Sequence, residues 1–351
     1  MINMDFLYLN HEDIIRNFKI KKAINEVERS FKEFSKGNIR LSHKIVQTFN
    51  KEEQDVIIAM PTTIWYKNIA GLKWISVFPK NPIIYKIPTL MALIILNDIK
   101  NGTPLCVMDG TFISNIRTGI VTAIAAKYLA REDSEVIGMI GSGNQAKSQI
   151  ISLVEVCPQI KEVRVTSRSI KNCHKFKRYI NETIKNKGIK IIPLKSKRDA
   201  IEGSDIIVTA TTAMEPLLKD KWIKKGSFYS HVGGWEDEYE VALNSDKIVT
   251  DNWEDNKHSD QKTLALMYRE GLITDKDIYA DLSDIILKKV PGRESELERI
   301  YFSSVGLAFT DIVIAYNLYT NALKNNVGEM INFFRKEFVH VQKGSKERND
   351  E

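Results

Sequence analysis

The stretch Val136-Ile-Gly-Met-Ile-Gly-Ser-Gly-Asn-Gln-Ala146 decides the fold. An apolar run ends in a glycine turn and a helical segment follows at 147–156. This G-x-G-x-x-A spacing between a strand and a helix is typical of dinucleotide-binding folds. Gly141 permits the tight turn, Gly143 lets the backbone approach a pyrophosphate, and Ala146 keeps the helix close to the strand. The free N–H groups at the helix start attract phosphate. Because any strand-to-helix turn favours glycine, the assignment also depends on the elements that follow.

Short apolar segments alternate with helical ones after the glycine turn. The strands expected there are 162–166, 189–192, 205–210, 228–232 and 247–250, and the helices are 170–187 and 197–203. Such alternation indicates a parallel, doubly wound sheet of the Rossmann type.

The first third of the chain has a different pattern. A strand is expected at 5–10, and its last residue, Asn10, is suited to cap a helix that begins at His11. An amphipathic helix at 21–35 is followed by strands expected at 39–47, 55–60, 70–77, 90–96 and 105–108. Turn residues between these strands indicate a largely antiparallel sheet in an α+β domain.

Two further helices, at 114–129 and from 311 onward, flank the alternating region. We therefore expect a Rossmann dinucleotide-binding domain at 118–310, inserted into an α+β substrate-binding and dimerisation domain formed by 1–117 and 311–351. The charged end, 342–351, is expected to be loosely held.

Composition excludes several classes of protein. At 351 residues the chain is long for one core, and its net charge of +6 is spread out, which gives no case for nucleic-acid binding. Cys106, Cys157 and Cys173 lack a disulfide framework and metal-ligand spacing, so we expect no metal and a reducing cytosol. The start lacks the features of a signal peptide, and no window approaches eighteen apolar residues. We expect a cytoplasmic protein without a membrane partner.

The residues at the end of the second Rossmann strand indicate which cofactor the site would bind. An NAD site usually has a carboxylate there to hold the ribose hydroxyls. Thr166-Ser-Arg-Ser-Ile-Lys171 has none. Arg168 is suited to pair with a 2′-phosphate, and Ser167 and Lys171 to assist, so the sequence favours NADP over NAD. The alternative is that these cations merely solvate a helix start.

Three side chains are candidates for the chemistry. Lys73 lies in an apolar strand, where desolvation would lower its pKa and make it a usable acid or base; a solvent-facing lysine is the alternative. Arg117 lies among apolar residues and would bind a substrate carboxylate or form an interdomain salt bridge. His231 follows a strand and would be a base or, more commonly, a hydrogen-bonded packing residue. His43 and His258 have no evident partner.

Five motifs, in this order and spacing, resemble the ornithine cyclodeaminase/mu-crystallin family over nearly the whole chain. They are Gly71-Leu-Lys-Trp74, Ile116-Arg-Thr118, Gly141-Ser-Gly-Asn-Gln-Ala146, Val208-Thr-Ala-Thr211 and Ser304-Val-Gly-Leu-Ala308. Four segments look closest to the branch that oxidises N-(2-amino-2-carboxyethyl)-glutamate to 2-oxoglutarate and 2,3-diaminopropionate for siderophores. These are Met4-Asp-Phe-Leu-Tyr-Leu-Asn10, Ile57-Ile-Ala-Met-Pro61, Ile94-Ile-Leu-Asn-Asp98 and Val290-Pro-Gly-Arg-Glu294.

The resemblance implies a role for each matching residue. Lys44 and Arg117 would hold the substrate α-carboxylate, Met60 would border that pocket, and Lys73 would be the acid/base beside the amine. It also implies a homodimer through the antiparallel sheets. Together with the glycine turn and the second strand, it gives as cofactor contacts Thr118, Gly141, Gly143, Asn144, Gln145, Ala146, Ser167, Arg168, Lys171, Ala210 and Thr211.

Two departures bear on the activity. Cyclodeaminases of this family carry an aspartate directly after Val-Gly-Gly, whereas Val232-Gly-Gly is followed here by Trp235, with Glu236 and Asp237 later. The Ser-Arg pair at 167–168 resembles NADP-using members. The sequence therefore predicts an NAD(P)-dependent oxidoreductase acting on the C–N bond of an amino acid or N-substituted amino acid. A cyclodeaminase, an imine reductase and a non-enzymatic NADP-dependent ligand-binding protein are the alternatives.

Overall fold

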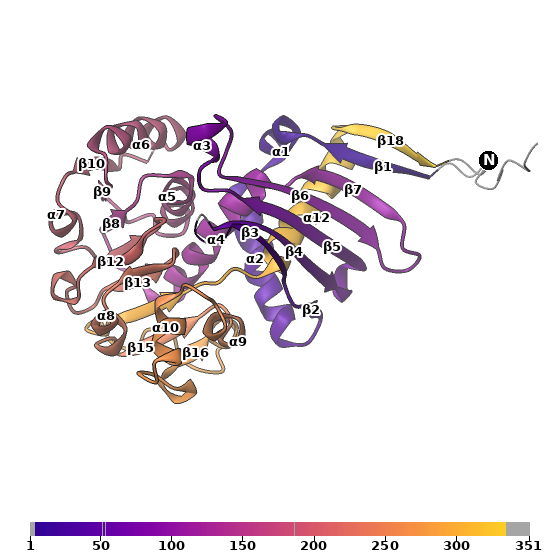
Figure 1. The fold of residues 1–351 in the computed structure, drawn as a ribbon. Coiled ribbons are helices and arrows are strands. Elements are labelled where there is room, and N and C mark those ends of the chain that lie inside the picture. Colours follow the sequence, from indigo (N-terminus) through magenta and orange to yellow (C-terminus); the bar gives the residue numbers. More distant parts are fainter. Residues whose placement is uncertain (1–3, 51, 53, 186, 335–351) are drawn as a thin grey trace, which may run out of the picture.

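Two eight-stranded sheets, A and B, hold most of the strands of the chain (Figure 1). The structure is a computed structural model and describes residues 4–50, 52, 54–185 and 187–334. The expected loose segment at 342–351 lies outside these residues.

Sheet A is formed by the first third of the chain and one late strand. Its strands are β1 (Met4–Leu9), β2 (Ile39–Leu41), β3 (Ile45–Asn50), β4 (Asp55–Ile64), β5 (Ile69–Val77), β6 (Leu90–Asp98), β7 (Pro104–Asp109) and β18 (Glu329–Phe334). They lie in the order β18-β1-β7-β6-β5-β4-β2, with β3 also paired to β4. The β1–β7 pair is parallel and the other pairs are antiparallel, so the prediction of a largely antiparallel sheet is confirmed.

Sheet B is parallel and has the strand order β10-β9-β8-β11-β13-β17-β15-β16. The chain crosses from one side of β8 to the other when it enters β11, which is the switch point of a Rossmann fold. The strands are β8 (Val136–Ile140), β9 (Glu162–Thr166), β10 (Lys190–Leu194), β11 (Ile206–Thr209), β13 (Phe228–His231), β15 (Lys247–Thr250), β16 (Ala280–Asp281) and β17 (Ile300–Ser303). A small third sheet pairs β12 (Met214–Leu218) with β14 (Trp235–Asp237).

Helices cover one face of sheet A and join it to sheet B (Figure 1). They are α1 (His11–Asn17), α2 (Ile20–Ser35), α3 (Asn81–Ile84), α4 (Thr111–Leu129), α5 (Asn144–Val156), α6 (Ile170–Thr183), α7 (Lys197–Ile201), α8 (Tyr239–Leu243), α9 (Trp253–Lys257), α10 (Thr263–Arg269), α11 (Leu282–Ile286) and α12 (Ala308–Asn325). The capping box between Asn10 and Asp13 confirms the predicted start of α1. The predicted limits of the inserted domain fall inside α4 and α12, and they stay a prediction.

Helix α12 returns the chain to sheet A and packs across β4, β5 and β6. Gly71 on β5 makes this approach possible, because a Cβ there would lie 2.7 Å from two side-chain atoms of Ile312. Ile69, Gly71, Lys73 and Ile75 face this packed side, since side chains alternate along a strand.

The predicted single strand at 39–47 is wrong. Leu41 pairs with Thr62 and Ile45 with Ala59, so three residues face two on β4 and the chain bulges between β2 and β3. Lys44 lies in this bulge. The sequence reading also missed β17 and β18, which are short and lack a clear alternation.

Cys106, Cys157 and Cys173 are buried and form no disulfide with one another. Among the described residues, no helix has both the length and the apolar character needed to span a membrane.

Candidate active site

A cavity of about 1890 Å³ lies where sheet B faces sheet A. Its walls come from the carboxyl ends of β8, β9 and β11, the start of α5, helix α4, and the segment 86–90 that leads into β6. This volume exceeds the 300–1,000 Å³ of a typical small-molecule pocket, so it has room for a dinucleotide and a second reactant. It lies at the switch point of sheet B, where α/β folds bind their ligands.

The glycine turn forms one wall of the cavity. Gly141 has a φ of +123° and a Cβ there would collide with the carbonyl oxygen of Ala210, so only glycine fits. Gly143 caps α5, and the position of its missing Cβ has no atom within 4 Å, which leaves the backbone open to a ligand. Ala146 is fully buried beneath this wall. The residues therefore fit a pyrophosphate at the start of α5.

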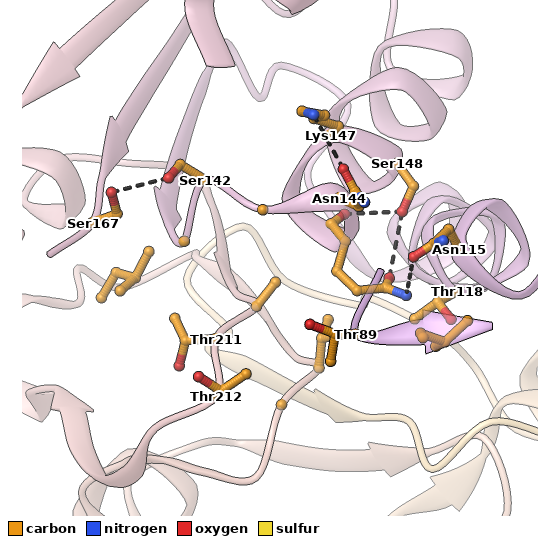
Figure 2. A pocket seen from close by; sticks show the side chains of 18 of the residues that line it. Thr89, Asn115, Thr118, Ser142, Asn144, Lys147, Ser148, Ser167, Thr211 and Thr212 are labelled. Carbon is orange, nitrogen blue, oxygen red and sulfur yellow. Dashed lines mark hydrogen bonds between the residues drawn. The ribbon is translucent and has the colours of Figure 1, made fainter. Parts of the chain in front are cut away.

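A hydrogen bond joins the start of α5 to α4, and others order the first turn of α5 (Figure 2). The Gln145 amide nitrogen donates to Asn115 over 3.3 Å, and Ser148 donates to the Gln145 backbone oxygen over 2.9 Å. Gly119 on α4 permits this contact, because a Cβ there would collide with the backbone oxygen of Ser148. Asn144 accepts a hydrogen bond from Lys147 over 3.1 Å. The cavity wall formed by the glycine turn and the start of α5 is thus held against α4, the helix that carries Arg117 and Thr118.

The end of β9 presents polar and cationic side chains to the cavity. Arg168 is exposed and lines it, whereas Lys171 is exposed and does not. The Ser167 hydroxyl receives a bond from Ser142 at 3.0 Å (Figure 2) and donates to the Ser169 backbone oxygen at 3.1 Å, so it orders the turn. Two further lysines line the cavity, Lys195 and Lys197; they were not predicted, because they follow a different strand, β10.

Thr118, Ala210 and Thr211 also line the cavity. Thr211 is held by Glu236, whose carboxylate accepts from the Thr211 backbone N–H over 2.6 Å and from its hydroxyl over 2.7 Å. The other oxygen of Glu236 accepts from Thr209 and from the Gly233 N–H. Glu236 is fully buried and does not line the cavity, and burial raises its pKa. It therefore anchors the loops after β11 and β13.

Lys73 forms a buried ion pair that the sequence did not reveal. Its Nζ donates to Oδ2 of Asp311 on α12 over 2.8 Å, and both side chains are fully buried. The Arg117 Nε lies 3.4 Å from the same oxygen. Burial lowers the pKa of Lys73 to about 8, while the Asp311 carboxylate acts in the opposite direction. The solvent-facing alternative for Lys73 is therefore wrong.

Of these three side chains, only Arg117 lines the cavity. Lys73 and Asp311 are fully buried behind Arg117. Gly306 has a φ of +82°, and a Cβ there would collide with the Arg117 guanidinium. The Gly306 and Val305 N–H groups bind the buried carboxylate of Asp251 over 2.8 and 2.9 Å. A guanidinium held open to the cavity in this way is suited to bind a carboxylate.

Lys44 and Met60, from the sheet A part of the chain, lie near the cluster of Lys73, Asp311 and Arg117. Met60 pairs with Lys73 across β4 and β5 and is 6% exposed. Burial lowers the pKa of Lys44, and its electrostatic neighbours are the carboxylates Asp255, Asp251 and Asp311 and the cation Arg117. Neither side chain lines the cavity.

His231 is a packing residue in this structure. Its ring contacts the Gly234 backbone oxygen at 2.5 Å and Ser303 Oγ at 3.3 Å, and it is fully buried. Burial lowers its pKa well below the usual value, so the neutral form is favoured. It does not line the cavity, and neither do His43 and His258.

Comparison with known proteins agrees with this geometry. The profile of the ornithine cyclodeaminase/mu-crystallin family matches residues 5–326. A curated relative, the N-((2S)-2-amino-2-carboxyethyl)-L-glutamate dehydrogenase of Staphylococcus aureus, is 30% identical over 80% of this chain and 83% of its own.

Two solved structures are also similar. The Δ1-pyrroline-2-carboxylate reductase of Thermococcus litoralis, in complex with NADH and L-proline, has a TM-score of 0.87 and 34% identity over 93% of this chain and all of its own. An archaeal alanine dehydrogenase dimer with bound NAD has the same TM-score and identity over 94% of this chain and all of its own. The predicted inserted-Rossmann fold class is therefore confirmed.

Proposed function

This chain belongs to the ornithine cyclodeaminase/mu-crystallin family, and on that premise we propose that it is an NAD(P)-dependent oxidoreductase acting at the C–N bond of an amino acid. The observation that carries this proposal is Lys73, a buried lysine whose pKa is lowered to about 8, paired with Asp311 behind the cavity wall that Arg117 forms. A lysine whose pKa is lowered toward neutrality next to a cleft is suited to acid–base work. The names of the similar reductase and dehydrogenases indicate that they act on amino acids or their imines.

The bound dinucleotide would supply the hydride acceptor or donor. Arg117 holds the α-carboxylate and so orients the Cα–N bond, and the nearby charge of Lys44 favours an anion there. Lys73 lies behind Arg117 and is fully buried in this structure, so the proposed proton transfer requires Arg117 to move aside when the substrate binds. In the oxidative direction Lys73 takes the amine proton, and water then splits the resulting imine into a carbonyl compound and a free amine. In the reductive direction Lys73 returns that proton.

Cyclodeamination is disfavoured by the surroundings of Glu236 and Asp237. The carboxylate of Glu236 is engaged by Thr209, Thr211 and Gly233, and Asp237 accepts from Thr263 over 2.7 Å. Neither lines the cavity. A carboxylate that assists ring closure must reach the substrate, and these two are held away from it.

We propose NADP as the preferred cofactor, although the similar solved structures contain NAD or NADH. Support comes from the cationic wall at the end of β9 and β10, where Arg168, Lys195 and Lys197 line the cavity and no carboxylate follows β9. The cytoplasmic location and the homodimer expected from the sequence also remain proposals.

The test is a screen of purified protein with NADP⁺ and NAD⁺ against amino acids and N-carboxyalkyl amino acids, including N-(2-amino-2-carboxyethyl)-glutamate. The matching imines are offered with the reduced cofactors. Absorbance of the reduced nicotinamide should change with at least one substrate. Ornithine converted to proline and ammonia without a net absorbance change would instead identify a cyclodeaminase. Ligand binding without any turnover would identify a binding protein.

A further inference from the structure

Lys262 is a second buried lysine at the cavity, on the side of sheet B. It is the residue before α10, is 8% exposed, and lines the cavity. Its Nζ donates to the Val232 backbone oxygen over 2.6 Å. Among the residues that the structure describes, it forms no ion pair with a carboxylate. It therefore differs from Lys73, whose ammonium is bound by Asp311.

The carboxylates around Lys262 are engaged elsewhere. Asp251 accepts from the N–H groups of Val305 and Gly306, and Glu236 from Thr209, Thr211 and Gly233. The third, Asp237, accepts from Thr263 through Oδ1 and makes no hydrogen bond to Lys262. They act on Lys262 only through their charge, and burial lowers its pKa to about 8. An ammonium has three donors, and one is bound here, so donors remain for a ligand at the cavity wall.

Lys262 belongs to the same end of the cavity as Arg117. Lys44 and Asp251 are electrostatic neighbours of Lys262, and Lys44 is also a neighbour of Arg117. Asp251 binds the N–H group of Gly306, which packs against the Arg117 guanidinium. Two cations from different elements, one on α4 and one before α10, thus face the region where the substrate would lie.

We propose that Lys262 binds a second carboxylate of the substrate, remote from the reacting amine, and so selects dicarboxylic over monocarboxylic amino acids or their N-carboxyalkyl derivatives. The inference rests on the proposed function, in which Arg117 holds the α-carboxylate. Its basis is an ammonium at the cavity wall with donors to spare and no carboxylate of its own.

The test uses ligands matched in carbon chain, with and without the distal carboxylate. L-Glutamate is compared with L-norvaline, and N-(2-amino-2-carboxyethyl)-glutamate with its norvaline analogue. The variants are Lys262→Met, which keeps the length without the charge, and Lys262→Arg, which keeps the charge. The wild type should favour the dicarboxylic member by about tenfold or more in kcat/KM, as expected for a charge-assisted hydrogen bond. Lys262→Met should lose this preference through KM and leave the norvaline compounds nearly unchanged, while Lys262→Arg retains part of it.

A second readout does not depend on turnover. 2-Oxoglutarate and 2-oxopentanoate are titrated by calorimetry into the complex with reduced cofactor, for the wild type and Lys262→Met. Tighter binding of 2-oxoglutarate that Lys262→Met abolishes supports the inference even if the screen finds no substrate, an outcome that would sink only the proposed function. Equal losses for both ligands in Lys262→Met, no preference in the wild type, or a loss of cofactor affinity in a variant that remains folded would each overturn the inference.

Discussion

The ammonium of Lys73 is buried beside Asp311 Oδ2, which the Arg117 Nε also approaches, and this burial lowers the pKa of Lys73 to about 8. A depressed lysine pKa means that the neutral base becomes available as pH rises through that value. If Lys73 takes the amine proton, the oxidative rate should increase as pH passes about 8, and the reductive rate should decrease. Lys262 titrates in the same range, so the profile must be recorded in Lys262→Met as well.

Replacing Lys73 by alanine removes the proposed acid/base. We expect kcat to fall by roughly 10² to 10⁴-fold while cofactor binding stays nearly intact. Steady-state kinetics and a titration with NADPH measure the two quantities. Lys67→Ala is the matched control, since Lys67 lies in the turn between β4 and β5, is paired with Glu26 and does not line the cavity, so it should leave kcat unchanged. A folded Lys73→Ala protein that keeps more than about a tenth of wild-type kcat would remove this lysine from the mechanism.

Asp311 positions Lys73 and stabilises its protonated form. Asp311→Asn keeps the size and removes the negative charge, so the pKa of Lys73 should fall further, by about one unit or more. The inflection of the pH–rate profile should move to lower pH by that amount, which a merely structural role of Asp311 would not cause. An unchanged inflection in a folded Asp311→Asn protein would contradict the role.

Arg168 is the proposed ligand of the 2′-phosphate. Arg168→Ala should weaken NADPH binding by about 1.5–3 kcal/mol, or roughly tenfold or more, and leave NADH binding almost unaltered. Lys171→Ala is the control, because Lys171 is exposed but does not line the cavity. Fluorescence titration of both cofactors measures the difference. Tighter binding of NADH than of NADPH by the wild type would refute the cofactor assignment.

Single residues were predictable where their backbone or strand pattern is distinctive. The glycine turn identifies Gly141 as a required glycine. The apolar residues on either side of Lys73 identify that lysine as unusual. Asp311 carried only a weak signal, a carboxylate at the start of the apolar run Ile312-Val-Ile-Ala. Lys262 carried none, because its burial and its hydrogen bond to the Val232 backbone oxygen arise only in the folded chain.

At the scale of elements, the approach of α12 to β5 determines whether Asp311 reaches Lys73. Gly71→Ala would place a methyl group 2.7 Å from Ile312, so we expect a loss of about 1–3 kcal/mol in the free energy of unfolding and a lower kcat. Ile312→Ala removes the opposing atoms, and the double variant should be more stable than the two separate effects predict. Denaturant unfolding measures this coupling.

Gly143→Ala is a control for that experiment. Its Cβ would meet no atom within 4 Å and its φ is ordinary, so stability should be retained. Cofactor binding should weaken, because the methyl group would occupy the space above the start of α5.

If the effects of Gly71→Ala and Ile312→Ala are additive, the position of α12 does not depend on the contact between Gly71 and Ile312.

The elements themselves were predictable where the pattern was strong, as in β5 and α2, whose buried residues recur at strand or helix spacing, and in β8, a continuous apolar run before the glycine turn. The break between β2 and β3 was not, because it arises from a one-residue mismatch with β4 that only the pairing reveals. The bulge has a consequence for the site, since it carries Lys44 toward the carboxylates Asp251 and Asp255.

For the whole molecule, the face of sheet A opposite α12 is apolar and exposed. Trp74 and Leu93 are paired neighbours there and are 41% and 49% exposed, and Met91 and Ile45 lie on the same face. Exposed apolar surface of this kind marks protein–protein contacts. Together with the similar archaeal dimer, it supports the proposed homodimer through the antiparallel sheets.

Sedimentation at micromolar concentration should therefore give a species of twice 40.2 kDa. Trp74→Asp and Leu93→Asp each place a charge in the proposed interface, where burying an unpaired carboxylate is costly, and each should shift the equilibrium toward monomer. Leu297→Asp is the matched control, because Leu297 is 65% exposed in the loop before β17 and should leave the mass unchanged. A wild-type protein that sediments as a monomer would contradict the homodimer. A dimer unaffected by both Trp74→Asp and Leu93→Asp would place its interface on another face of the molecule.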